Sequence, residues 1–289
     1  SGKTFSAGSY VLSGGTVSAV LAGSGNMTVS GDTTLNATNT FTGTVTVNSG
    51  ATLRSDNNRG LGATSSGTTV ASGGSLHLYS SSGTKSYGEN ITISGSGVSS
   101  SGAIQATGSN TITGDITLAA DSTLVSNTSA TFTVGSAGSV NGSSKDYDLT
   151  LAGAGDFSFA GDINLGDGGL TISSTGTTSI TGALTAGSYS VSGAATISTS
   201  ITTSGAQSYL AGSSIGGTDN QAVTLTASSV TFGTSVAAIG NDIDLTITGN
   251  MTTTGEFESN VSATFGLLSV SGTSAIGADI HTNSTQTYT

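Results

Sequence analysis

Apolar residues recur along the chain mainly at every second position rather than at helical spacing. Each apolar pair encloses one residue, usually a polar one, so one face of a short strand is apolar and the other is polar. Val, Ile and Thr, which favour strands, are frequent in these segments. The clearest pairs are Val45/Val47, Leu76/Leu78, Ile91/Ile93, Ile116/Leu118, Phe132/Val134, Phe157/Phe159, Ile163/Leu165, Val223/Leu225 and Leu245/Ile247. The pattern predicts an all-β protein of many short strands.

Gly, Ser, Asn and Asp fill the segments between these predicted strands, for example at 13–15, 48–50, 72–74 and 166–169. These residues supply turns and left-handed backbone positions. Short strands separated by frequent turns are typical of a sandwich, a barrel or a solenoid.

Internal repetition favours the solenoid. Segments 191–209 and 270–288 share Val-Ser-Gly, two Ile, a Thr, a Gln and a Tyr in register, and GDITL at 114–118 is echoed by GDINL at 161–165. Every coil of a solenoid solves the same stacking problem, so such echoes are expected. At roughly 20–25 residues per coil and about 4.8 Å per coil, we expect on the order of 12–14 coils in a rod about 60 Å long.

The predicted architecture is therefore a right-handed parallel β-helix, with residues 1–289 forming one continuous solenoid. We expect Val, Ile, Leu and Phe to stack in ladders inside and Thr and Ser to form hydroxyl ladders outside. The sequence reaches 285–289 just after a repeat has begun again, and no polar cap or amphipathic helix is recognisable there. Because an open coil end exposes unpaired backbone groups, we expect the rod to continue in a longer chain or to stack end to end on another copy.

The composition agrees with this architecture and narrows the function. The chain of 289 residues contains 45 Gly and no Pro, Cys or Trp, and only 7% of its residues are charged. Proline removes a ladder hydrogen bond, so its absence fits strands that are paired on both sides. The net charge of −11 disfavours binding to nucleic acid or to an anionic membrane surface. No apolar run approaches the ~18 residues of a membrane helix.

The ionisable residues show no converging pattern. His77 and His281 each stand alone, and the position of His77 between Leu76 and Leu78 predicts a solvated, outward ring. We place Arg54 and Arg59 together in a solvated loop. The remaining bases are Lys3, Lys85 and Lys145. An enzyme that cleaves polysaccharides needs clustered carboxylates or a carboxylate beside a base, so we predict that the chain is not an enzyme and assign no catalytic residues.

The acidic and threonine motifs are interpreted as structural. Asp pairs occur at Asp146/Asp148, Asp162/Asp167 and Asp242/Asp244. GDGG at 166–169 is the nearest match to a calcium-binding turn, but the glycine-rich nonapeptide pattern is absent, so no metal or cofactor is assigned. Thr-x-Thr occurs at 44–46, 224–226 and 246–248. Because this spacing is irregular, we do not expect a threonine array repeated from coil to coil.

Segment 39–78 resembles the autotransporter-associated β-strand repeat. The matching residues are Asn39, Thr40, Phe41, Gly43, Val47, Gly50, Leu53, Gly60, Leu61, Gly62, Val70, Gly73, Gly74, Leu76 and Leu78. Residues 79–289 resemble more loosely the Ser/Thr/Gly-rich repeats of giant bacterial surface proteins similar to filamentous haemagglutinins. The resemblance implies an exported parallel β-helix at the bacterial cell surface, associated with the outer membrane or extracellular, that acts in adhesion, biofilm or an envelope fibre.

Composition, repetition and resemblance together predict a structural, adhesive fibre protein. Its expected partners are further copies or coils of itself and, at its outer face, surface glycans or neighbouring cells. The alternative is a carbohydrate-active enzyme, a polysaccharide lyase or hydrolase, on the same scaffold. A groove with convergent Asp, Arg and Lys side chains would favour that alternative, and the scatter of these residues along the sequence disfavours it.

Overall fold

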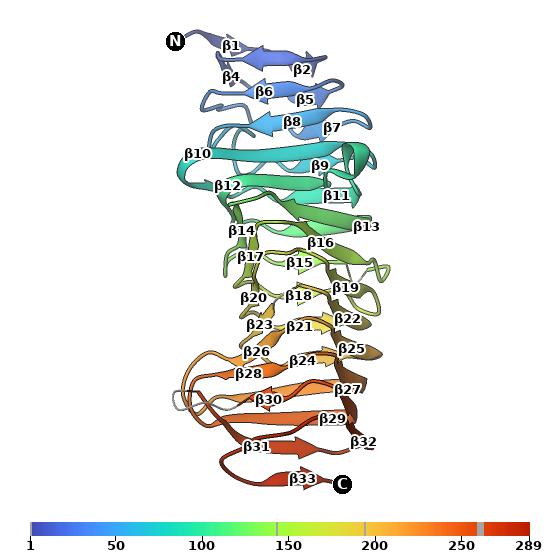
Figure 1. The fold of residues 1–289 in the computed structure, drawn as a ribbon. Coiled ribbons are helices and arrows are strands. Elements are labelled where there is room, and N and C mark those ends of the chain that lie inside the picture. Colours follow the sequence, from blue (N-terminus) through green and yellow to red (C-terminus); the bar gives the residue numbers. More distant parts are fainter. Residues whose placement is uncertain (1, 143, 194, 259–262) are drawn as a thin grey trace.

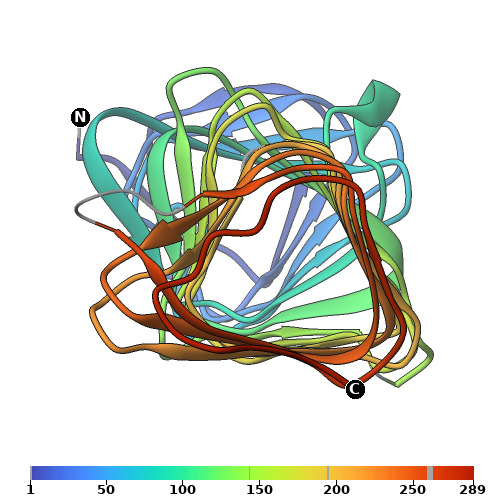
Figure 2. The ribbon, with the colours of Figure 1, turned by 60° about the horizontal axis from the view of Figure 1, so that its bottom comes forward.

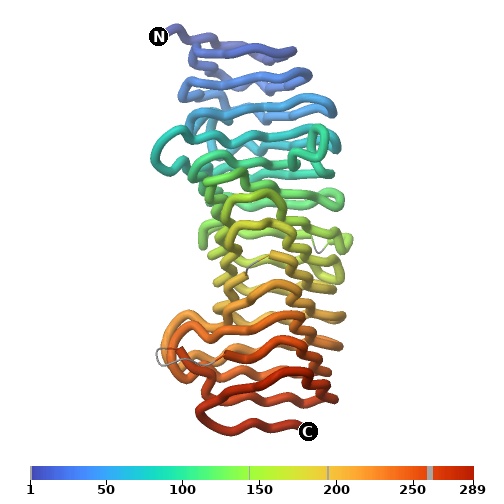
Figure 3. The backbone as a smooth tube through the Cα atoms, viewed as in Figure 1, coloured from blue at the N-terminus to red at the C-terminus, as the bar shows by residue number. Residues whose placement is uncertain are grey.

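The computed structural model describes residues 2–142, 144–193, 195–258 and 263–289. The chain forms a β-solenoid of about 12 turns, with the N-terminal residues at one end of the rod and the C-terminal residues at the other (Figure 1). The smooth trace in Figure 3 follows the chain from coil to coil without a break in the stack. The prediction of an all-β parallel helix is confirmed.

The strands are short and numerous. They are β1 (Thr4–Ser6), β2 (Ser9–Leu12), β3 (Gly15–Val17), β4 (Val20–Ala22), β5 (Asn26–Val29), β6 (Thr33–Leu35), β7 (Val45–Val47), β8 (Thr52–Ser55), β9 (Thr68–Val70), β10 (Ser75–Tyr87), β11 (Ile91–Gly95), β12 (Ile104–Ile112), β13 (Ile116–Ser126), β14 (Thr131–Val134), β15 (Val140–Asn141), β16 (Leu149–Gly153) and β17 (Asp156–Phe159). The second half contains β18 (Ile163–Asn164), β19 (Gly169–Ile172), β20 (Thr178–Ile180), β21 (Leu184–Ala186), β22 (Ser188–Val191), β23 (Ala195–Ile197), β24 (Ile201–Thr203), β25 (Ala206–Tyr209), β26 (Ser213–Gly216), β27 (Ala222–Phe232), β28 (Val236–Ile239), β29 (Ile243–Thr253), β30 (Phe257–Glu258), β31 (Phe265–Val270), β32 (Ser274–Ile276) and β33 (Gln286–Tyr288). Within the described ranges the single helical element is the 3₁₀ turn η1 (Val98–Ser100).

Parallel pairing brings equivalent residues of successive coils directly over one another. One inward column follows the rod through Tyr10, Met27, Val45, Thr68, Ile91, Ile116, Val140, Ile163, Leu184, Ile201, Leu225, Ile247, Val270 and Tyr288. Its steps are as short as 17 residues, from Tyr10 to Met27, and as long as 25, from Ile91 to Ile116. The strands keep register because the connecting segments absorb the difference in length.

Further inward columns fill the interior of the rod, and Figure 2 shows the stacked coils that surround it. One of them contains Leu53, Leu76, Ile104, Leu124, Leu151, Ile172, Val191, Tyr209 and Phe232. Another contains Ile112, Val134, Phe159, Ile180, Ile197 and Ile215. These residues are all buried, and so is every apolar pair singled out from the sequence. The expected ladders of apolar side chains are therefore present.

Aromatic rings form a continuous stack inside the C-terminal half. The ring centroids of Tyr209 and Phe232 are 5.0 Å apart, and those of Phe232 and Phe257 are 5.1 Å apart. Tyr189 and Phe265 extend this stack at its two ends. The ring contacts from Tyr189 to Phe257 each join neighbouring coils, so these aromatic residues link the coils by tilted, stacked and edge contacts.

The Gly-Asp-Ile-x-Leu echo marks a corner at which the backbones of successive coils meet closely. Gly114, Gly138, Gly161 and Gly182 lie over one another, and a Cβ atom on any of the last three would overlap the carbonyl oxygen of the preceding glycine. Glycine is required here because the approach is to rigid backbone rather than to a movable side chain. The echo noticed in the sequence is thus a stacking motif.

The Asp or Asn that follows this position satisfies a backbone donor of the next coil. Asp162 Oδ1 accepts a hydrogen bond from the amide of Ala183 at 2.8 Å, and Asp115 Oδ1 accepts one from the amide of Ser139 at 3.0 Å. The same bond joins Asn26 to Thr44, Asp32 to Thr52, Asn90 to Asp115, Asp121 to Asp148, Asp148 to Gly169, Asp156 to Thr177, Asp244 to Leu267 and Asn250 to Thr273. These bonds lie at the exposed corners, where each side chain gives an acceptor to a backbone amide that has no ladder partner of its own, and so joins one coil to the next.

Removing one of these side-chain acceptors is expected to destabilise its corner. Asp162→Ala leaves the Ala183 amide without its acceptor and should lower the free energy of unfolding by about 1 kcal/mol. Asp162→Asn keeps an Oδ1 acceptor and should be close to wild type. Chemical denaturation of both variants measures the difference, and equal stability of the two would contradict this role for the side chain.

The long sequence repeat is a single-coil unit that recurs on a different face. Tyr209 Oη donates to Gln207 Oε1 at 3.0 Å, and Tyr288 Oη donates to Gln286 Oε1 at the same distance. Val191 is paired with Tyr209 of the next coil, and Val270 is paired with Tyr288 of the next coil, but the two pairs belong to different inward columns. The 79-residue offset is therefore not a whole number of coils, and the repeat preserves local contacts rather than one face of the rod.

Candidate functional site

Hydroxyl-bearing side chains form ladders on the outer surface, as expected. One outer column runs Thr28, Thr46, Thr69, Thr92, Thr117, Asn141, Asn164, Thr185, Thr202, Thr226 and Thr248. All three Thr-x-Thr segments contribute to this column, so the expectation that they lack a common position is wrong. The irregular spacing of the Thr-x-Thr segments in the sequence hides their common position, because the connecting segments vary in length while the strands remain in register.

A second outer column contains a charged side chain and an aromatic one. Its first members, Thr16 and Thr34, are followed by Arg54, His77 and Gln105 in successive coils. Arg54 lies in strand β8, where its side chain alternates with buried neighbours. The placement of Arg54 in a solvated loop is therefore wrong, whereas Arg59 does lie in an exposed turn. The alternation within Thr52–Ser55 gave the signal for this strand, but the neighbouring turn residues obscured it.

The Arg54 guanidinium is held from two sides. Its Nε donates to Asp56 Oδ1 at 2.6 Å and its Nη2 donates to Asp56 Oδ2 at 3.1 Å, which makes a bidentate ion pair. The guanidinium carbon lies 3.6 Å from the centroid of the Tyr79 ring, in a cation–π contact. These contacts fix the orientation of a side chain that is otherwise flexible.

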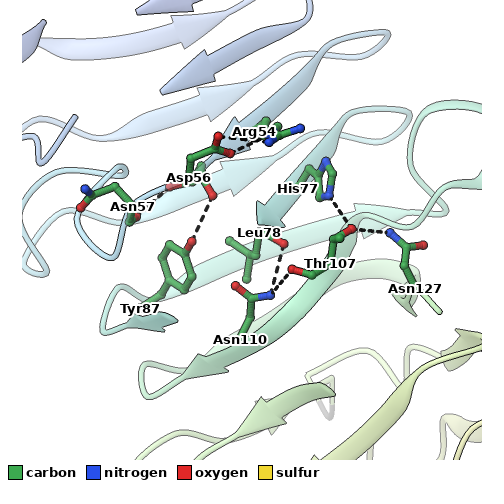
Figure 4. Close-up of polar contacts among 10 residues, drawn as sticks. Arg54, Asp56, Asn57, His77, Leu78, Tyr87, Thr107, Asn110 and Asn127 are labelled. Atoms are coloured by element: carbon green, nitrogen blue, oxygen red, sulfur yellow. Dashed lines mark hydrogen bonds and ion pairs between the residues drawn. The ribbon is translucent and has the colours of Figure 1, made fainter. Parts of the chain in front are cut away.

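His77 points outward, as predicted, but it is half-buried rather than fully solvated. Its Nε2 lies 2.9 Å from Thr107 Oγ1, and Asn127 Nδ2 donates to the same hydroxyl at 2.8 Å (Figure 4). The ring stands edge-on to Tyr79, with centroids 5.9 Å apart. Burial, together with the positive charge of Arg54, lowers the pKa of His77 below its usual value, so the imidazole is neutral at pH 7.

Arg54 and His77 line an open depression of about 220 Å³ that crosses three successive coils. The other lining residues are Asp32, Thr33, Thr34 and Thr52. Asp32 Oδ1 accepts a hydrogen bond from the Thr52 amide at 3.1 Å, so the carboxylate is fixed at the rim. The lining consists of polar side chains whose donors and acceptors lie on a rigid sheet, which makes the depression the strongest candidate functional site in the described part of the chain.

The other candidates from the sequence remain apart from this depression. His281 lies on the exposed surface of the last coil. In the GDGG turn, the Asp167 amide donates to Asp146 Oδ1 at 2.9 Å and the Gly169 amide donates to Asp148 Oδ1 at 2.6 Å. The carboxylates of these Asp pairs therefore join coils. Among residues 2–142, 144–193, 195–258 and 263–289, no three His, Cys, Asp or Glu side chains converge as a metal site.

Glu89 was not singled out from the sequence, although it is fully buried. Neither of its carboxylate oxygens has a hydrogen-bond partner. Burial is the main cause that raises the pKa of Glu89 above its usual value, and nearby backbone amides and Arg59 oppose the shift. In the sequence, Glu89 stands before Asn90 and Ile91 at the position where the corner motif Gly-Asx-Ile has glycine. This departure from the motif was the one sequence feature that could have pointed to Glu89.

We expect Glu89 to make the stability of the rod depend on pH. A raised pKa means that the folded chain binds the Glu89 proton more tightly than the unfolded chain does, so stability falls as the pH rises above the unfolded value of about 4.5. Glu89→Gln should therefore be more stable than wild type near pH 7 and should gain little at acid pH. Denaturant unfolding from about pH 4 to about pH 8 measures this, with exposed Glu256→Gln as the control. A Glu89→Gln difference that is constant over this range would contradict it.

No helix in the described ranges is both long enough and apolar enough to cross a membrane. Comparison with protein-family models, with curated proteins and with solved structures finds no match. The assignment of the chain as a β-helix repeat protein therefore depends on its own coil geometry.

Proposed function

We propose that the protein is a structural and adhesive rod of a bacterial cell-surface or extracellular fibre. The observation that carries the proposal is the unbroken inward column from Tyr10 to Tyr288, in which each coil is bonded to the next by backbone and side-chain ladders. Such a stack resists bending because the strands on each face of a coil are paired with strands of the neighbouring coils.

The outer surface supports the adhesive part of the proposal. It presents ladders of hydroxyl groups on a fixed lattice, and only 7% of the residues are charged. A rigid array of weak hydrogen-bonding groups suits contact with a hydrated polymer or a neighbouring cell, since many small contacts add without new ordering of the protein. The resemblance of 39–78 to the autotransporter-associated repeat supports export to the cell surface.

The exposed surface of the coil that contains Tyr288 supports stacking of another copy on the rod. Gln207 Nε2 donates to the Thr226 carbonyl of the next coil at 3.1 Å, and Tyr209 is 1% exposed. Gln286 and Tyr288 repeat the contacts within the coil, but Tyr288 is 39% exposed. An added coil would bury this surface as the interior coils bury theirs.

Electron microscopy of the purified chain and surface labelling of intact cells test the proposal. We expect straight, narrow particles about 60 Å long, or multiples of that length where rods stack. Antibodies against the purified chain should label unbroken bacterial cells that produce it, and external protease should remove that label. Compact round particles, or labelling only after the cells are opened, would contradict the proposal.

A carbohydrate-active enzyme is the second candidate, and the convergence of Asp32, Arg54 and Asp56 near one depression favours it. The structure places both carboxylates in other contacts, with Asp32 on the Thr52 amide and Asp56 on Arg54. We therefore rank hydrolysis or elimination below binding. Release of reducing ends or of unsaturated sugars from polysaccharides by the purified chain would reverse that order.

A further inference from the structure

We propose that the depression lined by Asp32, Arg54 and His77 binds a neutral sugar residue of a glycan chain. This sugar site rests on the proposed function, because an adhesive rod requires a ligand on its surface. The depression contains groups from β6, β8 and β10, which lie in successive coils at intervals of about 4.8 Å.

The size of the depression suits a small ring rather than an extended ligand. Its volume of about 220 Å³ is below the ~300–1,000 Å³ that is typical of pockets for larger molecules. The depression is open to solvent, so one sugar unit can enter it while the rest of a glycan lies along the outer face. The neighbouring hydroxyl ladders then offer further hydrogen bonds to the adjoining units.

The lining matches the hydrogen-bonding groups of a sugar. Asp32 uses Oδ1 for the Thr52 amide, which leaves Oδ2 to accept from a sugar hydroxyl. Arg54 uses Nε and Nη2 for Asp56, which leaves Nη1 to donate to a sugar oxygen. Thr34 adds a hydroxyl group that both donates and accepts. A ring with adjacent hydroxyl groups can engage an acceptor and a donor at once.

The local charge distinguishes a neutral sugar from an anion. Asp32 and Asp56 contribute two negative charges near the depression, against one positive charge from Arg54 that is already paired with Asp56. His77 adds no charge at neutral pH, and the chain as a whole has a net charge of −11. A phosphate, sulfate or uronate group would be repelled, whereas an uncharged polyol would not.

The site is also held in place before any ligand arrives. Arg54 lies between Asp56 and the Tyr79 ring, and the Tyr79 ring meets His77 at its edge. Thr107 and Asn127, from the two following coils, support His77 from behind. Because these groups are ordered in the folded rod, binding costs little conformational entropy, which favours even weak contacts with a sugar.

Saturation-transfer NMR with the whole chain tests the inference. The neutral probes are methyl glycosides of glucose, galactose, mannose and N-acetylglucosamine, and the anionic probes are glucuronate and inorganic phosphate. We expect transfer to at least one neutral glycoside and none to the anions. In Arg54→Gln and Asp32→Asn, binding should weaken about tenfold, as for the loss of one charge-assisted hydrogen bond.

Asp156→Asn is the matched control, because Asp156 makes the same corner bond, to the Thr177 amide, far from the depression. Asp32→Asn keeps an acceptor for the Thr52 amide, so it tests the site without removing that corner bond. The inference is overturned if no neutral glycoside receives transfer, if the signal survives in both site variants, or if the anions bind as strongly. If one of these results is obtained while microscopy still shows rods, only the sugar site is contradicted. If microscopy shows no rods, the proposed function is contradicted.

Discussion

Phe232→Ala is expected to lower the free energy of unfolding by about 3–5 kcal/mol, the range for truncating a fully buried aromatic ring. The side chain is inaccessible to solvent, and its ring packs on Tyr209 in one neighbouring coil and Phe257 in the other. Truncation removes both contacts and leaves a cavity that the stacked backbones cannot close. Thermal unfolding by calorimetry and hydrogen exchange of β27 are the measurements.

Phe5→Ala is the control for this prediction, because Phe5 is 59% exposed and its truncation should change stability by less than about 0.5 kcal/mol. Phe232→Leu fills part of the cavity and should fall between the two. If Phe232→Ala unfolds like Phe5→Ala, the aromatic stack does not hold the coils together.

The alternation of residues along the chain predicted the fold because it depends on local physics. Pairs such as Val45/Val47 and Phe157/Phe159 show which side chains face inward, and period-two burial requires nothing from distant parts of the chain. The repeated Gly-Asp-Ile segments further indicated that the strands stack in coils. Both features recur whenever a coil passes the same corner, so one sequence contained many independent copies of the same signal.

Contacts between coils could not be predicted in the same way. Thr46 and Thr69 lie side by side across 23 residues, and Thr185 and Thr202 lie side by side across 17. No fixed period in the sequence links them. The depression has the same origin, since Asp32, Arg54 and His77 meet only once the register of their three coils is known. Glu89 was missed because its burial follows from the position of a corner, which the sequence marks only by the glycine that it lacks.

The close approach at the corners gives the second large effect. Gly161→Ala places a methyl group where the Gly138 carbonyl oxygen lies, with the Gly135 carbonyl oxygen also close by. Backbone atoms cannot move aside as a side chain does, so the two coils must separate locally. That separation weakens the hydrogen bond from the Val140 amide to the Asp162 carbonyl, which is 2.8 Å long. We expect a loss of about 3 kcal/mol, at the upper end of the cost of overpacking.

Gly212→Ala is the matched control, and the opposite sign is expected for it. A Cβ atom at Gly212 meets nothing within 4 Å, and its backbone is not in the left-handed region. Alanine there restricts the unfolded chain and should stabilise the rod by about 0.4–1 kcal/mol. Parallel denaturant titrations of the two variants, with hydrogen exchange at 138–163, measure the contrast. If Gly161→Ala proves as stable as Gly212→Ala, contact between coils does not require glycine at the corners. The interpretation of the repeated Gly-Asp-Ile segment as a stacking motif is then wrong.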